Sequence, residues 1–465
     1  MMRFLFLFCL LPVTLVAQLP EAAWFFSAGS NSSRGAASVL LENGDILFTG
    51  TYRQLSEDVY LSRRDSEDNK LWDKNLGLND DEFVNNMIAL NATTVVICGD
   101  VIDSDGNMDG FLLAVDTSGT LLWRSTFGVA DRNEDFYSLA IDSEGYILVA
   151  GFVTASVGEG NDMLVAKYDN AGNQIWRTIW GSEVNDYAMG ICVSPGGTIF
   201  ISADKWIEGV GYNAIIFSLT SDGVVEGEFP VTLPYNSGCK NLLMNSFGKL
   251  IMTGESATAA GPAFDILLVQ IDTLGTIDWV QWLGDIAGSE AGYDVAEAAD
   301  GSYLITGFGY NALTENNDIF VVHADMAGEE LQRWYYGGSN VDYAYDIHSD
   351  VAGNYWVSGF SNAGDTTQFA LIRGVIDLTL PVVDQPTMHL DVYPNPASGT
   401  VTVAMNEVDL ATAYCYNLSG KKVREWSVAG PLQTIDLDGI ASGVYLLRFR
   451  TASGWLPGAQ RLVVE

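Results

Sequence analysis

Hydrophobic and polar residues alternate along most of this chain in short runs separated by turn residues. In residues 122–169, Trp123 opens a strand that ends at Gly128, and strands near 137–142, 146–152 and 163–168 follow. Alternation with a period of two, bounded by turns at 143–145 and 169–172, is typical of short β-strands. The stretch lacks helical periodicity, so the pattern predicts an all-β protein.

This pattern returns about every 51 residues, and three markers recur in phase. The first marker is an opening tryptophan: Trp24, Trp72, Trp123, Trp176, Trp279 and Trp334, with Phe229 in the remaining unit. The second is a strand-ending glycine: Gly50, Gly99, Gly151, Gly254, Gly307 and Gly359, with Ala203 in the remaining place. The third is a pair of acids seven residues apart: Asp58/Asp65, Asp109/Asp116, Asp162/Asp169, Asp265/Asp272 and Asp318/Asp325, replaced by Asn213/Thr220 and Gln368/Val375 in two units.

Seven such units run over residues 22–376, each with about four strands. Four strands per unit at this period predict a β-propeller, because blades packed radially cover faces that one small sheet leaves exposed. We therefore predict one ring of seven four-stranded blades, with Trp72, Trp123, Trp176, Trp279 and Trp334 at equivalent places. The strand-ending glycines predict close backbone approach, and Asp-x-x-Gly, as at 116–119, predicts a type I turn capped by aspartate. The repeats resemble the degenerate propeller repeats of large exported bacterial proteins.

The cysteines set limits on cofactors. After residue 17 they are Cys98, Cys192, Cys239 and Cys415, widely scattered, and we expect buried thiols rather than a disulfide framework. The Asp-x-x-Gly-x-x-x-Trp stretches, as at 116–123, resemble the docking motif of quinoprotein propellers. The cofactor site of that family includes a vicinal disulfide, and no adjacent cysteine pair occurs here, so we expect no quinone.

After residue 376 the repeat stops. Residues 377–387 carry Pro381 and Pro386 and predict a linker, and the short strands of residues 388–465 predict an immunoglobulin-like β-sandwich. The landmarks of this tail are Tyr393, Pro394, Asn395, Pro396, Gly420, Lys421, Gly443 and Tyr445, with an alternating strand over 400–404 and the closing segment 461–465.

With these motifs the tail resembles the C-terminal sorting domain of the type IX secretion system, found in certain Gram-negative bacteria. In that family the tail carries its cargo across the outer membrane, is commonly removed, and leaves the cargo released or fixed to surface lipopolysaccharide. The resemblance implies that the type IX machinery is a partner. It also implies a protein that is secreted or lies on the outer face of the outer membrane. The last segment is often lysine-rich in the family, whereas here it carries Arg461 and ends in Glu465.

The first 17 residues predict a signal peptide. Arg3 precedes an apolar run over 4–16 that is too short to span a membrane, and cleavage is expected between Ala17 and Gln18. No later run reaches the roughly 18 apolar residues of a spanning helix, so no transmembrane helix is expected.

The net charge is −37, from 59 acidic and 22 basic residues. Such a field repels nucleic acid, and it is compatible with cations, neutral glycans or basic proteins. Asp103, Asp105, Asn107 and Asp109 place oxygens at alternate positions, which suits Ca²⁺, although Met108 and Ala114 exclude an EF-hand. The alternative is a solvated loop, and the same holds for the acidic loops with Asp80, Asp81 and Glu82, and with Asp131, Glu134 and Asp135.

No residues form a recognisable catalytic motif. The histidines are His323, His348 and His389, without an HExxH, a Cys/His cluster or a GxSxG elbow. The sequence therefore favours a binding or scaffold protein for a glycan or a protein. The alternative is an extracellular carbohydrate-active enzyme that uses paired carboxylates of the propeller.

Deleting residues 390–465 tests the assignment of the tail. Because the seven repeats end before the linker, the truncated chain should fold and remain in the periplasm, as judged by fractionation and immunoblotting. Normal levels at the surface or in the medium would contradict the sorting role. An unfolded product would show that the tail belongs to the propeller.

Overall fold

The computed structural model describes residues 22–464 apart from a set of short segments. The gaps are 27–32, 54–55, 67–68, 78–79, 130–131, 155–159, 208–210, 234, 259–260, 285–287, 363–366, 377–389, 394–396, 406–409, 418–421, 430–431, 452–453 and 456–459. The predicted signal peptide, its Ala17/Gln18 cleavage site and the linker lie outside the described residues. The chain divides into two compact units, residues 1–378 and 379–465. The described residues include no helical segment with the length and hydropathy of a membrane span.

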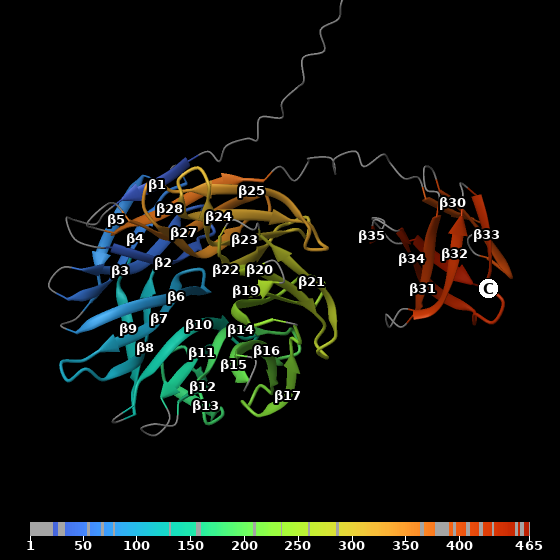
Figure 1. Cartoon of the computed structure of the whole chain (residues 1–465). Helices are drawn as coiled ribbons and strands as arrows, with labels where there is room; N and C mark the ends of the chain where they lie inside the picture. Colours follow the sequence, from blue (N-terminus) through green and yellow to red (C-terminus); the bar gives the residue numbers. More distant parts are fainter. Residues whose placement is uncertain are drawn as a thin grey trace, which may run out of the picture. The chain divides into compact units, whose positions relative to one another are not determined.

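Seven four-stranded antiparallel sheets form the predicted seven-bladed propeller, so this prediction is confirmed (Figure 1). Blade 1 contains β2 (Ser33–Leu40), β3 (Ile46–Arg53), β4 (Glu57–Arg64) and β5 (Lys70–Asn75). Blade 2 contains β6 (Asp81–Asn91), β7 (Thr94–Ile102), β8 (Met108–Asp116) and β9 (Leu121–Phe127). Blade 3 contains β10 (Glu134–Ile141), β11 (Ile147–Thr154), β12 (Asn161–Tyr168) and β13 (Gln174–Trp180). Blade 4 contains β14 (Asp186–Val193), β15 (Ile199–Ile207), β16 (Gly211–Leu219) and β17 (Val225–Pro230). Blade 5 contains β18 (Ser237–Met244), β19 (Leu250–Thr258), β20 (Gly261–Ile271) and β21 (Ile277–Leu283). Blade 6 contains β22 (Glu290–Glu297), β23 (Tyr303–Asn311), β24 (Asn316–Ala324) and β25 (Glu330–Tyr336). The first strand of each blade is the innermost one, and the fourth lies at the rim (Figure 1).

Blade 7 is assembled from both ends of the propeller sequence. It contains β26 (Asp342–Ser349), β27 (Asn354–Asn362) and β28 (Thr367–Val375), and β1 (Ala22–Phe26) pairs with β28 as its outer strand. Each sequence repeat, counted from its aromatic marker, therefore gives its first strand to one blade and its other three strands to the next. No turn joins β28 to β1, which explains why Val375 stands where five of the other blades carry the turn aspartate and blade 4 carries Thr220.

The aromatic markers pack between neighbouring blades. A Cβ atom on Gly172 would lie 2.6 Å from the ring of Trp123, and one on Gly223 would lie 2.7 Å from the ring of Trp176. Trp123 Nε1 also donates to the Asn170 carbonyl at 2.9 Å. Each ring therefore lies directly on a turn glycine of the next blade. These glycines have φ near +80°, which a side chain at the same place would strain.

The prediction that Trp334 is equivalent to the other four tryptophans is wrong. Trp334 pairs with Val321, and Gln332 pairs with His323 at the position that corresponds to Trp72, Trp123, Trp176 and Trp279. Blade 7 has no β28–β1 turn, so the turn glycine that would receive the ring is absent. Trp334 instead packs against Tyr355, with ring centroids 6.1 Å apart.

The strand-ending glycines mark the predicted close backbone approach. A Cβ atom on Gly307 would lie 1.9 Å from the carbonyl oxygen of Ala291, and one on Gly99 would lie 1.8 Å from that of Phe83. Each contact lies beside a β-bulge of the innermost strand, such as the register shift between Gly292 and Asp294. Bulges bend a strand and re-aim its side chains, so the glycine and the bulge together shape the centre of the ring.

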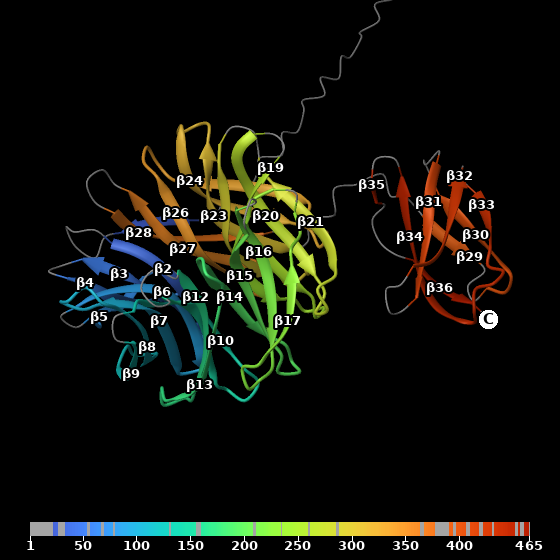
Figure 2. The same cartoon turned by 60° about the horizontal axis from the view of Figure 1, so that its bottom comes forward.

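The C-terminal unit contains two sheets (Figure 2). One holds β29 (Leu390–Tyr393), β30 (Thr400–Met405) and β33 (Leu432–Asp436), and the other holds β31 (Leu410–Asn417), β32 (Lys422–Ala429), β34 (Gly443–Thr451), β35 (Gly454–Trp455) and β36 (Gln460–Val464). Val403 and Ile435 from the first sheet share a buried cluster with Cys415 and Leu447 from the second. The immunoglobulin-like assignment of this unit stays a prediction.

Substituting Gly307 by alanine tests the close approach. The new methyl group must push β22 and β23 apart, and we expect the free energy of unfolding to fall by about 1–3 kcal/mol in urea denaturation. The matched control is Ala203→Gly, the reverse change at the equivalent position of blade 4, which should cost less than about 1 kcal/mol. Equal, small losses in both variants would contradict the argument.

Candidate functional site

A β-bulge interrupts every innermost strand at the same place near its beginning. The register is conserved around the ring while the side chains at the bulge differ. The bulge residues, in blade order, are Ala36, Asn85, Tyr137, Met189, Lys240, Tyr293 and Tyr345. We call these residues and their side-chain neighbours the axial cluster, because the innermost strands surround the axis (Figure 1).

Two groups of aromatic side chains dominate the axial cluster. In blades 6 and 7, five rings form a closed circuit with centroids 4.6–6.0 Å apart: Tyr293, Phe308, Tyr343, Phe360 and Tyr345. In blades 3 and 4, a second series runs from Tyr137 through Phe152, Tyr187 and Tyr212 to Trp206, which is 42% exposed. Nearly all of these rings are only partly buried, so they present apolar faces to solvent.

Lys240 is the single basic residue among the bulge residues, and it lies beside the blade 6–7 aromatics. Its Nζ is 3.4 Å from Glu255 Oε1 and 5.7 Å from the Tyr293 ring centroid. Burial opposes protonation, but Glu255 and Asp204 outweigh it and raise the pKa of Lys240. Burial raises the pKa of Asp204 to about 6, against the lowering effect of Lys240 and of the Cys239 amide.

Asp100 and Asp135 form a carboxyl pair beside Tyr137. Asn85 Nδ2 donates to Asp135 Oδ1 at 2.7 Å. Burial first, and then the charge of Asp100, raise the pKa of Asp135 well above its ordinary value. Two carboxylates in one desolvated site cannot both ionise easily, so burial and Asp100 favour the protonated form of Asp135.

A chain of hydrogen bonds links the axial cluster across the closing junction. Asp294 Oδ2 accepts from the Ile347 amide at 2.7 Å, and Asp346 Oδ2 accepts from the Ser38 amide at 2.9 Å. His348 Nε2 lies 2.6 Å from the Ser38 carbonyl and 3.1 Å from Asp346 Oδ1. Although burial opposes it, Asp346 raises the pKa of His348 to about 9, while burial and Asp346 raise that of Asp294 to about 7.

The acidic residues that the sequence placed in solvated loops include buried strand residues, which corrects that expectation. Glu82 and Glu134 lie at the start of innermost strands and are fully buried, and Asp135 is 8% exposed. The beginning of each innermost strand is enclosed by the neighbouring blade, and the sequence pattern gave no sign of this. Asp81 is exposed and accepts from the Glu57 amide at 2.9 Å, and Asp131 lies outside the described residues.

The four residues of the predicted calcium loop form two separate sets of hydrogen bonds in the structure. Asp103 Oδ1 accepts from the amides of Asp105 and Asn107, so this side chain caps its own turn. Asn107 Nδ2 donates to Asp109 Oδ1 at 2.5 Å on the other side of the loop. Within the part of the chain that the structure describes, no three His, Cys, Asp or Glu side chains are grouped to hold a metal ion. A calcium ion held by these four residues stays a prediction.

The remaining predicted residues have structural contacts. His323 Nε2 lies 2.8 Å from Ser302 Oγ, and burial lowers the pKa of this histidine; His389 lies outside the described residues. The four cysteines that the sequence singled out are free. In the tail, Tyr445 Oη donates to the Ala441 carbonyl at 2.7 Å and Gly443 begins β34, whereas Tyr393 ends β29. Pro394, Asn395, Pro396, Gly420 and Lys421 lie outside the described residues.

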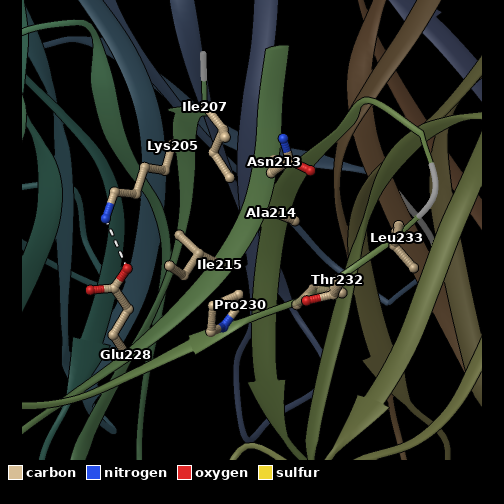
Figure 3. A pocket seen from close by; sticks show the side chains of 10 residues that line it. Lys205, Ile207, Asn213, Ala214, Ile215, Glu228, Pro230, Thr232 and Leu233 are labelled. Carbon is tan, nitrogen blue, oxygen red and sulfur yellow. Dashed lines mark hydrogen bonds and ion pairs between the residues drawn. The ribbon is translucent and has the colours of Figure 1, made fainter. Parts of the chain in front are cut away.

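A pocket of about 320 Å³ lies on blade 4 (Figure 3). Ile215, Pro230 and Leu233 give it apolar walls, and the ion pair between Lys205 and Glu228, 2.8 Å long, lies at one side. Asn213 also lines it, at the place where other blades carry the first aspartate of the acidic pair. The pocket therefore lies in the repeat that departs most from the three sequence markers.

Comparison with protein families identifies the tail. Residues 391–465 match the family described as the secretion system C-terminal sorting domain. The chain thus carries a type IX sorting domain, which directs export to the cell surface or the medium and makes the type IX secretion machinery its partner.

Other comparisons find proteins of low identity. The regulatory protein FlaEY of Caulobacter vibrioides is 21% identical over 187 residues, and the match covers 35% of this chain and 20% of that protein. Virginiamycin B lyase from Staphylococcus aureus is 12% identical with a TM-score of 0.47, covering 76% of this chain and 99% of that one. The propeller domain of the trilobed protease from Pyrococcus furiosus is 8% identical with a TM-score of 0.45, covering 76% and 98%. Such likenesses concern the fold alone.

The His348 contacts predict a pH dependence of stability. The pKa of His348 is about 9 in the folded chain against an ordinary 6.5, so its contribution is complete below pH 6.5 and is lost as the pH rises through 9. Because 40% of the side chain is exposed, water screens the pair, and we expect a loss of about 1 kcal/mol. Urea denaturation at pH about 6 and about 10 measures it.

His348→Gln is the variant that isolates this effect. In this variant the free energy of unfolding should decline less between pH about 6 and about 10. A small decline up to about pH 7 should remain, because the pKa of Asp294 is also raised. A decline in the variant as steep as that of the unchanged protein would show that His348 is not its source.

Proposed function

We propose that the propeller is the ligand-binding part of this exported protein and that the axial cluster binds a neutral glycan. The observation that carries the proposal is the closed circuit of five partly exposed aromatic rings in blades 6 and 7, beside Lys240 and Glu255. Ring faces provide apolar contact at low entropic cost, and carboxylate and ammonium groups provide acceptors and donors for hydroxyl groups.

Charge narrows the class of ligand. The net charge of −37 repels polyanions such as acidic polysaccharides and nucleic acids. A neutral glycan avoids this repulsion. A basic protein is the competing ligand, and its binding would depend strongly on salt because exposed charges are screened.

A hydrolase or lyase is the second candidate function, and the Asp100–Asp135 pair favours it. A carboxyl group whose pKa is raised is suited to general acid catalysis. Under this alternative, Asp135→Asn abolishes turnover of a polysaccharide and leaves its binding largely intact. Turnover by the unchanged protein in a degradation screen would contradict a purely binding role.

Truncation of the aromatic circuit tests the binding proposal. Tyr293→Ala and Tyr345→Ala should each weaken retention on a neutral polysaccharide at least tenfold, because buried aromatic contacts carry most of the affinity at such sites. Glycan arrays and affinity electrophoresis identify the polymer and measure the change.

Phe247→Ala provides the matched control. Phe247 is 63% exposed in the turn between β18 and β19, at the opposite end of the blade. Its removal should leave affinity unchanged. Equal losses in all three variants, or no loss in the tyrosine variants, would show that the ligand does not bind at the axial cluster.

A further inference from the structure

Two polar positions recur where the outer strand of one blade leads into the innermost strand of the next. The first lies in the first half of the third strand of a blade, and the second lies at or directly after the start of the innermost strand of the following blade. Five junctions carry two acids: Asp58/Glu82, Asp109/Glu134, Asp162/Asp186, Asp265/Glu290 and Asp318/Asp342.

The two positions change together within this one chain. The junction between blades 4 and 5 carries Asn213 and Ser237, and the junction between blades 7 and 1 carries Gln368 and Ser33. No junction keeps one acid and loses the other. The two carboxylates therefore share a role that the fold itself does not require, because the ring closes where both are absent.

Protein groups compensate the second acid at several junctions. Arg124 lies 3.0 Å from Glu82, and Arg333 lies 2.7 Å from Glu290. Asp186 Oδ2 accepts from the Ser182 amide at 2.7 Å. At Glu134, Arg132 and Arg177 are close enough to lower the pKa, although burial raises it to about 7.

At the junction between blades 6 and 7, amide and hydroxyl groups are the compensating donors, and no described arginine or lysine takes part. Asp318 and Asp342 are 1% and 0% exposed, and among the described residues neither forms an ion pair with lysine or arginine. Asp318 Oδ2 accepts from Asn311 Nδ2 at 2.7 Å and Thr314 Oγ1 at 2.8 Å, and Asp342 Oδ2 accepts from the Gly338 amide at 3.0 Å. Among the described residues, the Oδ1 atoms of both aspartates and the buried Oδ1 of Asn316 have no hydrogen-bond partner. Burial raises the pKa of Asp342, and the Ser361 hydroxyl lies close enough to oppose that rise.

The two carboxylates converge on one point. Asp318 Oδ1 and Asp342 Oδ2 both lie 2.4 Å from the position that a Cβ atom on Gly337 would occupy, so they lie within twice that distance of each other. Asn316 Nδ2 donates to the Thr314 and Gly338 carbonyls, which fixes this amide beside them. Buried acceptors without a donor are costly, and two adjacent carboxylates are more so.

We propose that the junction between blades 6 and 7 binds a Ca²⁺ ion through the carboxylates of Asp318 and Asp342 and the amide oxygen of Asn316. Hard oxygen donors of this kind suit Ca²⁺, which accepts irregular geometry and additional carbonyl or water ligands, whereas Mg²⁺ demands a nearly ideal octahedron. Asn107, Asp109 and Glu134 occupy the same three positions between blades 2 and 3. There Asn107 donates to Asp109 and the arginines oppose a cation, so the junction between blades 6 and 7 is the stronger site.

Terbium luminescence on the purified full chain tests the proposal directly. Tb³⁺ replaces Ca²⁺ at oxygen sites, and Tyr336, which directly precedes Gly337, can sensitise its emission. We expect emission that Ca²⁺ displaces, with a dissociation constant for Ca²⁺ of about 10⁻⁴–10⁻³ M. Addition of Ca²⁺ should also raise the Tm by a few degrees over the same protein in EGTA.

The Asp318→Asn/Asp342→Ser variant locates the ion. It reproduces the Asn213/Ser237 junction, which this fold already accommodates, and it should lose one displaceable Tb³⁺ and most of the Ca²⁺-dependent shift in Tm. Asp325→Asn, an exposed turn acid at the other end of β24, is the control of equal chemistry and should keep both. If the double variant does not fold, isosteric Asp318→Asn alone takes its place.

Two results would overturn the proposal. One is the absence of Ca²⁺-displaceable emission and of any Ca²⁺-dependent Tm in the unchanged protein. The other is a junction variant with the full Tb³⁺ stoichiometry of the unchanged protein. Neither result depends on the ligand of the axial cluster, so the two proposals fail independently.

Discussion

The pairing of β1 with β28 is the contact on which the rest of the propeller depends. Five residues from the beginning of the propeller sequence close a blade whose other strands come from its end, with Ala22 opposite Arg373. Without β1, β28 would be an exposed edge of blade 7. The hydrogen bonds that Ser38 donates to Asp346, and the ring contact between Phe48 and Phe369 with centroids 5.0 Å apart, lie across the same junction. A contact of such long sequence separation forms late and at high entropic cost, so the order of the whole ring rests on a short strand.

Recurring positions hold the blades together, whereas variable positions give the blades different side chains around the axis. Positions that recur in nearly every unit, such as the strand-ending glycines and the turn aspartates, hold backbone segments together. Asp169, for example, accepts from the side chain and the backbone amide of Asn173 and from the backbone amide of Ala171, which lowers its pKa. The bulge positions have the same backbone geometry in every blade but carry residues as different as Ala36, Lys240 and Tyr345. A fixed geometry with variable side chains is how a repeat scaffold acquires a binding site.

Much of the fold could be predicted from the sequence, because the repeat period and the strand count determine a seven-bladed ring. The repeat period does not show which strands share a blade. The prediction for Trp334 is wrong because the pairing of β1 with β28 leaves blade 7 without the turn on which the other tryptophans pack. The axial cluster could not be predicted. Asp135, Asp204, Lys240 and Tyr293 lie roughly 35 to 70 residues apart and meet only after the ring closes. Glu82 and Glu134 were taken for loop residues because an acidic side chain ordinarily signals exposure.

Burial of acids in so negative a chain requires compensation, and the structure uses several kinds. Arginine neutralises Glu82 and Glu290, protonation is favoured at Asp135 beside Asp100 because its pKa is raised, and a histidine pairs with Asp346. Each has a different sensitivity: an arginine pair persists at all ordinary pH values, while the proton and the histidine respond to pH. A metal ion would add a fourth kind, sensitive to ion concentration. Because such a site binds weakly, it would fill only where Ca²⁺ is abundant, and export by the sorting domain takes the chain to the outside of the cell. The blade junctions would then be tighter after export than before it, since the carboxylates that repel one another in the ion-free chain would be bridged at its destination.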